Sequence, residues 1–179
     1  MPPAMITVLL AHPYPDRSRA NRLLARAVDD LPGVVLRSLY DLYPDFAIDA
    51  DAERDALAAS DVVVWQHPVL WYTAPALLKL WFEQVLTAGW AYGPGGNALR
   101  GKSCLWVVTT GGDDGDYSPD GVHGHLFDAF AAAVRQTARF CGMEWLEPLI
   151  VHAANRLDEE ALHAWGERYR ARLVEVGHA

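Results

Sequence analysis

Short apolar runs alternate with longer amphipathic segments along this chain. Five runs have the length of β-strands: Met5–Ala11, Val34–Leu39, Asp61–Gln66, Ser103–Thr109 and Trp145–Val151. A continuous apolar run such as MITVLLA is typical of a strand that is covered on both faces. Between and after them, apolar residues at helical spacing predict helices over Ser18–Leu31, Ala50–Ala59, Pro75–Leu86, Val122–Phe140 and Leu157–Val176. Strands that alternate with helices in this way form right-handed crossovers and a parallel sheet.

One doubly wound α/β domain accounts for this order of elements. The chain has 179 residues, which is enough for a single domain with a sizeable core, so we assign residues 1–179 to it. The common strand order for such a five-stranded sheet is 2-1-3-4-5, the flavodoxin-like order, with helices on both faces. Ligands of these sheets bind beyond the carboxyl ends of the strands, here the first, third and fourth.

The overall composition narrows the classes of function. Hydrophobic residues make up 51% and charged residues 21%, which is typical of a soluble globular protein. The net charge of -8 argues against non-specific binding to nucleic acid, because that binding requires a basic face. The two cysteines lie in no metal-binding pattern and predict buried, reduced thiols. The start of the chain does not resemble a signal peptide and no apolar run has membrane-spanning length, so we expect a cytoplasmic protein.

The loop after the first strand, Ala11–Asn21, is a candidate anion site. Its sequence, AHPYPDRSRAN, lacks both the dinucleotide-binding glycine pattern and the lysine of a phosphate-binding loop. Ser18 occupies a helix N-cap position, where its hydroxyl and the free backbone amides after it can hold a phosphate. Alternatively, Ser18 only caps its helix, and the arginines clustered nearby are solvated: Arg17, Arg19, Arg22 and Arg26.

The loop after the third strand, within Gln66–Val85, carries two aromatic residues at the expected mouth of the site. Trp71 and Tyr72 stand between a buried strand and a helix that begins with proline. They can stack on a planar ring or form a wall beside it. Alternatively, they pack against the next helix, as we expect Leu77, Leu80, Trp81 and Val85 to do.

The loop after the fourth strand, Thr109–His125, offers backbone amides and acid–base groups. Its TTGG sequence leaves amides accessible to a flat ligand. Tyr117 and His123 can donate to a developing anion and supply a proton, although such residues also occur as ordinary loop side chains. His123 and His125 have no third ligand at a recognisable spacing, so we expect no metal site.

Together these loops resemble those of the NAD(P)H:quinone oxidoreductases of the flavodoxin-like superfamily. The resemblance runs in order through AHPYPDRSRAN, WQHPVLWYTAPALLKLWFEQV, GWAYGPGG, TTGG and FCGMEWLEP. Within this superfamily the chain looks most similar to the bacterial ancillary proteins of glutathione-regulated potassium-efflux systems, through LYDLYPDFAID, WQHP and GWAYG. The segment DDGDYSPDGVHG is instead more similar to the diaphorase-type enzymes.

This resemblance implies a bound flavin and a homodimer with active sites at the subunit interface. Carried onto matching positions, it places four residues around the flavin phosphate side: His12, Ser18, Ala20 and Asn21. It places eight along the isoalloxazine ring: Val69, Leu70, Trp71, Tyr72, Thr109, Thr110, Gly111 and Gly112. Tyr117 and His123 match a pair that supports hydride transfer. The chain lacks the long carboxyl-terminal extension of animal diaphorases, which favours FMN, with FAD as the alternative.

The implied reaction is a two-electron, ping-pong transfer from NADH or NADPH. Hydride passes to the flavin N5, and a quinone-type acceptor then takes the electrons. One alternative, compatible with this activity, is a regulatory ancillary subunit of a potassium-efflux membrane protein, which would bring the chain to the inner membrane. The other alternative is a flavodoxin-type carrier of single electrons, which would leave the Tyr117/His123 pair without a role.

Overall fold

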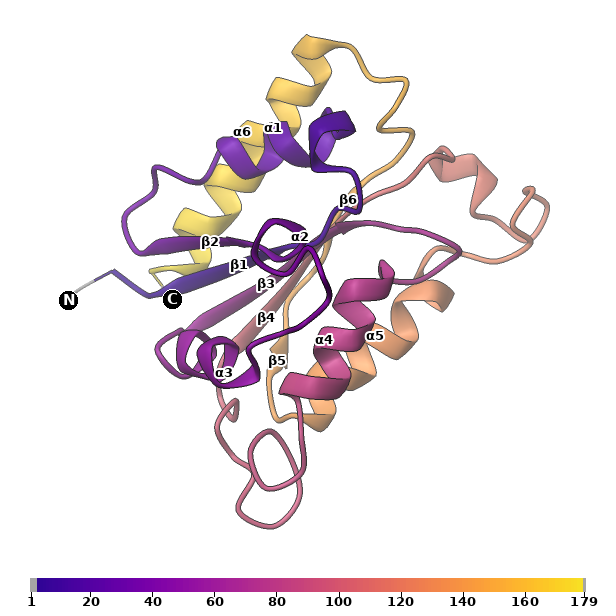
Figure 1. Ribbon diagram of the computed structural model, residues 1–179. Helices are drawn as coiled ribbons and strands as arrows, with labels where there is room; N and C mark the ends of the chain where they lie inside the picture. The colour runs from indigo at the N-terminus through magenta and orange to yellow at the C-terminus, as the bar shows by residue number, and fades with distance from the viewer. Residues whose placement is uncertain (1–2, 179) are drawn as a thin grey trace.

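A parallel β-sheet with helices on both faces organises the molecule, as the computed structural model shows for residues 3–178 (Figure 1). The strands β1 (Ile6–Leu10), β2 (Val34–Ser38), β3 (Val62–Pro68) and β4 (Ser103–Thr109) pair in the order β2-β1-β3-β4. The strand β5 (Glu144–Trp145) follows beyond β4. This is the predicted doubly wound sheet with its 2-1-3-4-5 order, and every pairing is parallel.

The fifth strand position is divided into two short strands. The predicted strand Trp145–Val151 appears as β5, which pairs with Ser103 and Cys104, and β6 (Leu149–Val151), which pairs with the other end of β4. Pro148 lies between them and has no N–H to donate to a ladder. The interruption is therefore a direct consequence of the sequence at this edge.

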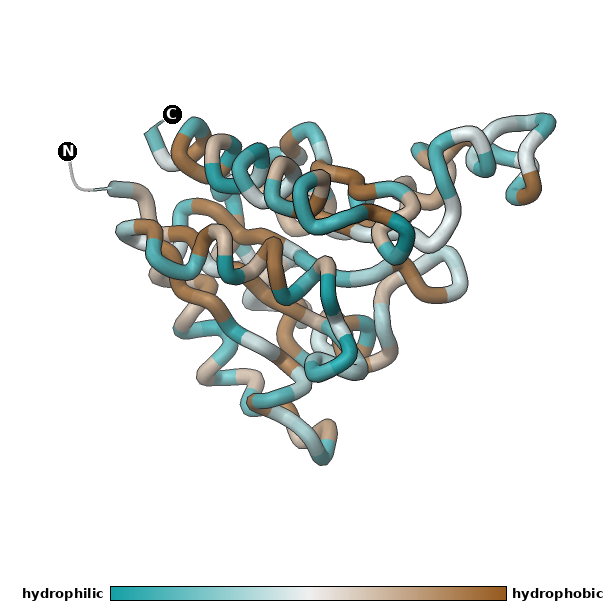
Figure 2. Tube along the Cα trace, turned by 90° about the horizontal axis from the view of Figure 1, so that it is seen from above, coloured by the Kyte–Doolittle hydropathy of each residue, from teal (hydrophilic) through white to brown (hydrophobic). Residues whose placement is uncertain are grey.

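Two helical layers bury the two faces of the sheet. On one face lie α1 (Ala20–Arg26) and α6 (Glu159–Val176), and on the other lie α3 (Ala50–Ala58), α4 (Ala76–Val85) and α5 (Asp128–Phe140) (Figure 1). Each layer encloses its own cluster of buried apolar side chains. In Figure 2 hydrophobic stretches of the chain run through the middle of the molecule, whereas hydrophilic residues recur along the helices and loops around them. Cys104 and Cys141 are buried and free, as predicted.

Two helix boundaries differ from the sequence prediction by more than two residues. The first helix ends at Arg26 rather than Leu31, and turns lead into β2. The helix predicted from Val122 begins at Asp128, because the preceding segment is held in turns by glycines. A Cβ at Gly121 would lie 2.4 Å from the Asp116 backbone oxygen, and Gly124 has a φ of 65°. Short helices that the sequence did not reveal are η1 (Pro15–Arg17), α2 (Leu39–Leu42) and η2 (Asp114–Asp116).

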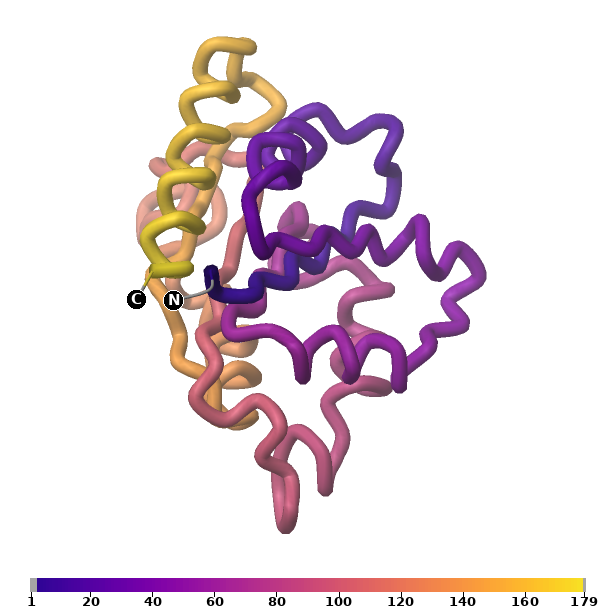
Figure 3. Tube along the Cα trace, turned by 90° about the vertical axis from the view of Figure 1, so that its left-hand side faces the viewer, coloured from indigo at the N-terminus to yellow at the C-terminus, as the bar shows by residue number. Residues whose placement is uncertain are grey.

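Long loops project at both edges of the sheet. The loop between α4 and β4, residues 86–102, extends from the amino edge and forms the lower tip of the molecule in Figures 1 and 3. The segment that follows β4, residues 110–127, extends from the carboxyl edge and carries η2. Among residues 3–178, no helix combines the length and the apolar character needed to cross a membrane.

Candidate active site

A cavity of about 460 Å³ opens at the carboxyl edge of the sheet. Residues from the loops after β1, β3 and β4 line it, and the segment after β6 closes it with Ala154 and Asn155. The cavity therefore unites the three loops that the sequence singled out. Nine predicted site residues lie in its wall: His12, Ser18, Ala20, Asn21, Val69, Leu70, Thr109, Thr110 and Gly111.

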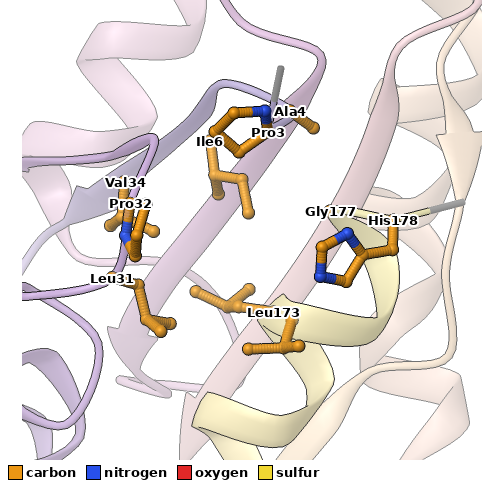
Figure 4. A pocket seen from close by; sticks show the side chains of 10 residues that line it. Pro3, Ala4, Ile6, Leu31, Pro32, Val34, Leu173, Gly177 and His178 are labelled. Carbon is orange, nitrogen blue, oxygen red and sulfur yellow. The ribbon is translucent and has the colours of Figure 1, made fainter. Parts of the chain in front are cut away.

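A smaller pocket of about 140 Å³ lies at the opposite, amino edge. Its wall is mostly apolar and includes Ile6, Leu31 and Leu173, which point toward one another in Figure 4. None of the three strand-end loops that carry the candidate chemistry reaches this edge. The carboxyl-edge cavity is therefore the candidate active site.

Ser18 presents a polar group to the cavity without a protein partner. Its side chain is buried, and its hydroxyl makes no hydrogen bond. The N-cap prediction for Ser18 is wrong, because Arg19 occupies that position and no side chain caps the helix. Leaving a buried hydroxyl unpaired costs about 1–3 kcal/mol, so the position favours a ligand that can accept its proton.

The buried side-chain amides of Asn21 and Gln66 connect α1 to the neighbouring strands by hydrogen bonds. The Asn21 side-chain nitrogen donates to the Thr109 hydroxyl at 2.9 Å, and the Gln66 side-chain nitrogen donates to the Asn21 backbone oxygen at 2.8 Å. The side-chain oxygens of Asn21 and Gln66 remain without partners. The Asn21 oxygen thus stands ready to accept from a ligand hydroxyl at the cavity wall.

The basic residues near Ser18 divide into two groups. Arg17 and Arg19 line the cavity, and Arg19 also donates to the Leu157 backbone oxygen, which ties this loop to the start of α6. Arg22 and Arg26 line a neighbouring depression instead. The nearby His12 is half-buried, and burial lowers the pKa of its imidazole below its usual value.

Trp71 and Tyr72 occupy a strained turn at the cavity mouth. Leu70 and Thr73 exchange backbone hydrogen bonds of 3.0 and 3.1 Å, and the two aromatic residues between them have φ values of 48° and 66°. Positive φ at both central positions defines a type I′ turn, which favours asparagine and glycine over bulky residues. The Trp71 side chain is 91% exposed, so packing in the core does not explain it.

Tyr72, Tyr117 and His123 form an aromatic cluster beside the cavity. The Tyr72 hydroxyl lies 3.4 Å from the His123 Nδ1, and its ring stacks on Phe130 at 5.0 Å. The Tyr117 ring stacks on His123 with centroids 4.3 Å apart. Burial raises the pKa of Tyr117, so its hydroxyl keeps its proton at neutral pH.

The two glycines after Thr110 have different surroundings. A Cβ on Gly111 would meet nothing within 4 Å, so its backbone faces open space at the cavity. A Cβ on Gly112 would lie 3.1 Å from the His123 Nε2 and 3.3 Å from the Tyr117 ring. Gly112 therefore allows the aromatic pair to approach the loop, while Gly111 leaves its amide accessible.

Comparison with known proteins gives a match to the flavodoxin-like fold family model over residues 4–173. The chain belongs to this family. The glutathione-regulated potassium-efflux system ancillary protein KefF of Klebsiella aerogenes is 49% identical over 171 residues, which cover 96% of each chain. Among solved structures, general stress protein 14 of Treponema denticola, in complex with FMN, has a TM-score of 0.88 and 32% identity, and covers 94% of this chain and 97% of its own.

A second solved structure points in the same direction. The NADPH-quinone reductase of P. pentosaceus has a TM-score of 0.86 and 25% identity, over 94% of this flavodoxin-like chain and 97% of its own. These relatives confirm the resemblance to quinone reductases and to the efflux ancillary proteins that the loop sequences indicated.

Sequence reasoning missed two histidines of this flavodoxin-like domain. His152 follows β6 at the carboxyl edge, with its Nδ1 3.0 Å from the Thr110 hydroxyl. His67 is fully buried in β3, where its Nδ1 donates to the Pro68 backbone oxygen and its Nε2 accepts from Trp106. The available signal for His152 was its place directly after the fifth predicted strand, at the ligand-binding edge. Within residues 3–178, no group of three or more acidic, histidine or cysteine side chains is arranged to hold a metal ion.

Proposed function

We propose that this protein is an FMN-dependent NAD(P)H:quinone oxidoreductase. The observation that carries the proposal is the cavity at the carboxyl edge: the buried, partnerless Ser18 hydroxyl lies in its wall, and the aromatic cluster comes from the same loops as Leu70 and Gly111 of that wall. The relatives described above support it, because one was solved in complex with FMN and another is a quinone reductase.

The residues in the cavity wall fit FMN. The Ser18 hydroxyl is free to donate to a phosphate oxygen, and the Asn21 oxygen is free to accept from a hydroxyl of the ribityl chain. Val69 and Leu70 provide apolar contact for the ring, and the open backbone at Gly111 can approach its edge. When bound, the flavin would accept hydride from NADH or NADPH and supply two electrons to the quinone.

Tyr117 and His123 would act beside the flavin ring. Because Tyr117 keeps its proton, its hydroxyl can donate a hydrogen bond to negative charge that develops on a bound acceptor. His123 contacts both Tyr117 and the Tyr72 hydroxyl, so its imidazole is held where it can give or take a proton. Trp71 and Tyr72 would form one wall of the acceptor shelf and tolerate many flat quinones.

We also propose a homodimer in which the partner covers the cavity mouth. The support is the exposure of Leu70 (40%), Trp71 (91%) and Tyr72 (46%) in the single chain. An apolar group of this kind at a binding site commonly marks a contact with another protein. The measurement is the molecular mass in solution, and a monomer at micromolar concentration would contradict this part of the proposal.

The activity is tested with purified protein. It should be yellow, or should become yellow with added FMN, and should oxidise NADH or NADPH when a benzoquinone is supplied. Denaturation should release FMN rather than FAD, as chromatography of the supernatant will show. A protein that stays colourless with both flavins would overturn the proposal.

A second function is favoured by the identity with KefF. We propose that the chain also serves as an ancillary subunit of a potassium-efflux membrane protein, which would hold it at the cytoplasmic face of the inner membrane. The 49% identity over nearly the whole chain supports this role. A pull-down with the cytoplasmic domain of such an efflux protein from the same genome tests it, and the absence of binding by the FMN-loaded protein would contradict it.

A further inference from the structure

His152 follows β6 and contacts the loop after β4 at several points. Its imidazole packs against the Tyr117 ring at 5.3 Å between centroids and meets the Phe127 ring edge-on at 5.2 Å. Its Nδ1 lies 3.0 Å from the Thr110 hydroxyl, and its Nε2 lies 3.5 Å from a carboxylate oxygen of the exposed Asp114. One side chain thus contacts the TTGG loop, η2 and Tyr117 of the acid–base pair.

The hydrogen bond between His152 and Thr110 must be donated by the imidazole, because the Thr110 hydrogen is already used. The Thr110 hydroxyl has one hydrogen, and it donates this hydrogen to the Gly112 backbone oxygen at 2.8 Å. The hydroxyl is therefore an acceptor toward His152, and the imidazole must carry its proton on Nδ1. Burial lowers the pKa of His152, against the opposing effect of Asp114 and Asp113, so at neutral pH the ring is neutral with a bare Nε2.

The backbone on both sides of His152 is attached to the same loop. The Thr110 N–H donates to the Val151 oxygen at 3.0 Å, and the Ala154 N–H donates to the Thr110 oxygen at 2.9 Å. The Ala153 N–H donates to the Gly112 oxygen at 2.8 Å, and Ala153 has a φ of 50°. Such a φ is unfavourable for alanine and persists only where surrounding contacts impose it. The position of His152 relative to the TTGG loop is therefore closely defined.

Thr110 connects His152 to the groups that would face the flavin. Its hydroxyl accepts a hydrogen bond from the His152 Nδ1–H and donates one to the Gly112 carbonyl, which helps to set the backbone conformation at Gly111. The imidazole itself also packs against the Tyr117 ring, with centroids 5.3 Å apart. A change at His152 is thus transmitted both to the loop and to Tyr117.

We propose that His152 is a positioning residue of the candidate site: its Nδ1–H fixes the Thr110 hydroxyl and through it the Thr110–Gly112 backbone, and its ring holds the Tyr117 side chain in place. This inference rests on the proposed function, because the loop matters only if it holds the flavin. His152 does not line the cavity itself, but it contacts Thr110, which does.

Two substitutions separate the hydrogen bond from the packing of the ring. H152F keeps an aromatic ring against Tyr117 and Phe127 but removes the donor, whereas H152N keeps an N–H near the position of Nδ1. H163N is the matched control, because His163 is exposed on α6. For each protein the FMN dissociation constant is measured by quenching of flavin fluorescence, and the amide resonances of Gly111 and Gly112 are recorded in the flavin-free protein by NMR.

We expect H152F to raise the FMN dissociation constant about tenfold, which is the net value of one hydrogen bond. The two glycine resonances should move in H152F, and H152N should remain within about twofold of the unsubstituted protein with unmoved resonances. Equal losses in H152N and H152F, or no change in either, would overturn the positioning role.

The same experiment keeps the two proposals apart. If the unsubstituted protein binds FMN but does not turn over NAD(P)H and quinone, the oxidoreductase proposal fails while the comparison of dissociation constants still decides the role of His152. If it binds no FMN, the flavin proposal fails, and the glycine resonances alone decide whether His152 sets the loop. A lower melting temperature in both H152F and H152N but not in H163N, without a difference in the resonances, would show a purely structural role and overturn the inference.

Discussion

The ring of Tyr117 lies on the ring of His123, with centroids 4.3 Å apart and planes inclined by 25°. The two residues are separated by a turn-rich segment, and the His123 N–H donates to the Asp116 backbone oxygen at 3.1 Å. This bond folds the segment back on itself and brings both rings to the loop after β4. A stacked pair of this kind presents a hydroxyl and an imidazole as one unit.

We predict that Y117F and H123Q slow flavin reduction by NAD(P)H more than they weaken flavin binding. General acid–base and hydrogen-bond contributions of this kind are worth about 10²-fold or more in rate. Stopped-flow absorbance at the flavin band measures the rate, and fluorescence titration measures the affinity. H125Q is the control, because His125 is exposed in the same loop. Unchanged reduction rates in both variants would remove the pair from catalysis.

Replacement by alanine should weaken FMN binding at Ser18 but lower the stability of the fold at Ser60. The Ser18 hydroxyl is buried without a partner, whereas the Ser60 hydroxyl contacts the Thr7 hydroxyl at 2.6 Å and donates to the Ala56 backbone oxygen at 2.7 Å. S18A should weaken binding of FMN about tenfold but leave binding of riboflavin, which lacks the phosphate, unchanged. S60A should affect neither flavin and should lower the free energy of unfolding by about 1–2 kcal/mol.

The flavin-free S18A protein should also be at least as stable as the unsubstituted one, because the substitution removes a hydroxyl that has no partner. Urea unfolding measures this difference. A large loss of stability in S18A, with equal weakening of FMN and riboflavin, would show that Ser18 supports the fold rather than a phosphate.

Replacing Trp71 in its strained turn should raise the stability of the protein and weaken its activity. Asparagine adopts positive φ more readily than tryptophan, and the Trp71 side chain is 91% exposed and has little packing to lose. W71N should therefore raise the free energy of unfolding by about 1 kcal/mol. W71A also removes the ring but gains less, because alanine resists the same backbone conformation. Both variants should raise the apparent KM for benzoquinone several-fold, and an unchanged KM would exclude Trp71 from the acceptor shelf.

Because His67 is buried as a neutral imidazole, we predict that the free energy of unfolding decreases in acid. Complete burial lowers its pKa from 6.5 to about 4, so between these values the unfolded chain takes up a proton that the folded chain does not. The His67 contribution to stability is therefore complete above about pH 6.5 and decreases as the pH falls toward 4, by about 3 kcal/mol in total.

The variant H67Q keeps an acceptor for the Trp106 N–H but does not titrate. The difference in unfolding free energy between the two proteins should change in favour of H67Q as the pH falls from 7 to 4, as urea titrations at each pH will show. Parallel pH profiles for the two proteins would contradict the assignment of a neutral, buried imidazole.

The sheet could be predicted from the sequence because its inner strands are continuous apolar runs with few alternatives. The runs at β1, β3 and β4 agree with the structure to within a residue or two. The segment before α5 was misassigned because Val122 and Leu126 continue a helical spacing, whereas the glycines among them impose turns and leave both side chains exposed. Backbone conformation outweighed apolar periodicity there.

The candidate site was predictable only as a set of loops. Strand order places the carboxyl ends together, so residues such as Asn21 and Thr109, 88 positions apart, could be expected at one edge. The partnerless state of the Ser18 hydroxyl could not be predicted, because burial without a partner is a property of packing. His152 escaped notice for the same reason: its contact with Thr110 depends on how the last strand ends.

The division of the fifth strand also protects the open edge of the sheet. β5 and β6 offer only two and three residues of ladder, and Pro148 between them cannot donate to an incoming strand. An edge of this kind is a poor template for a strand from another molecule, so it resists edge-to-edge aggregation. Replacing the proline would lengthen the available ladder and give the protein a route to self-association that the present sequence closes.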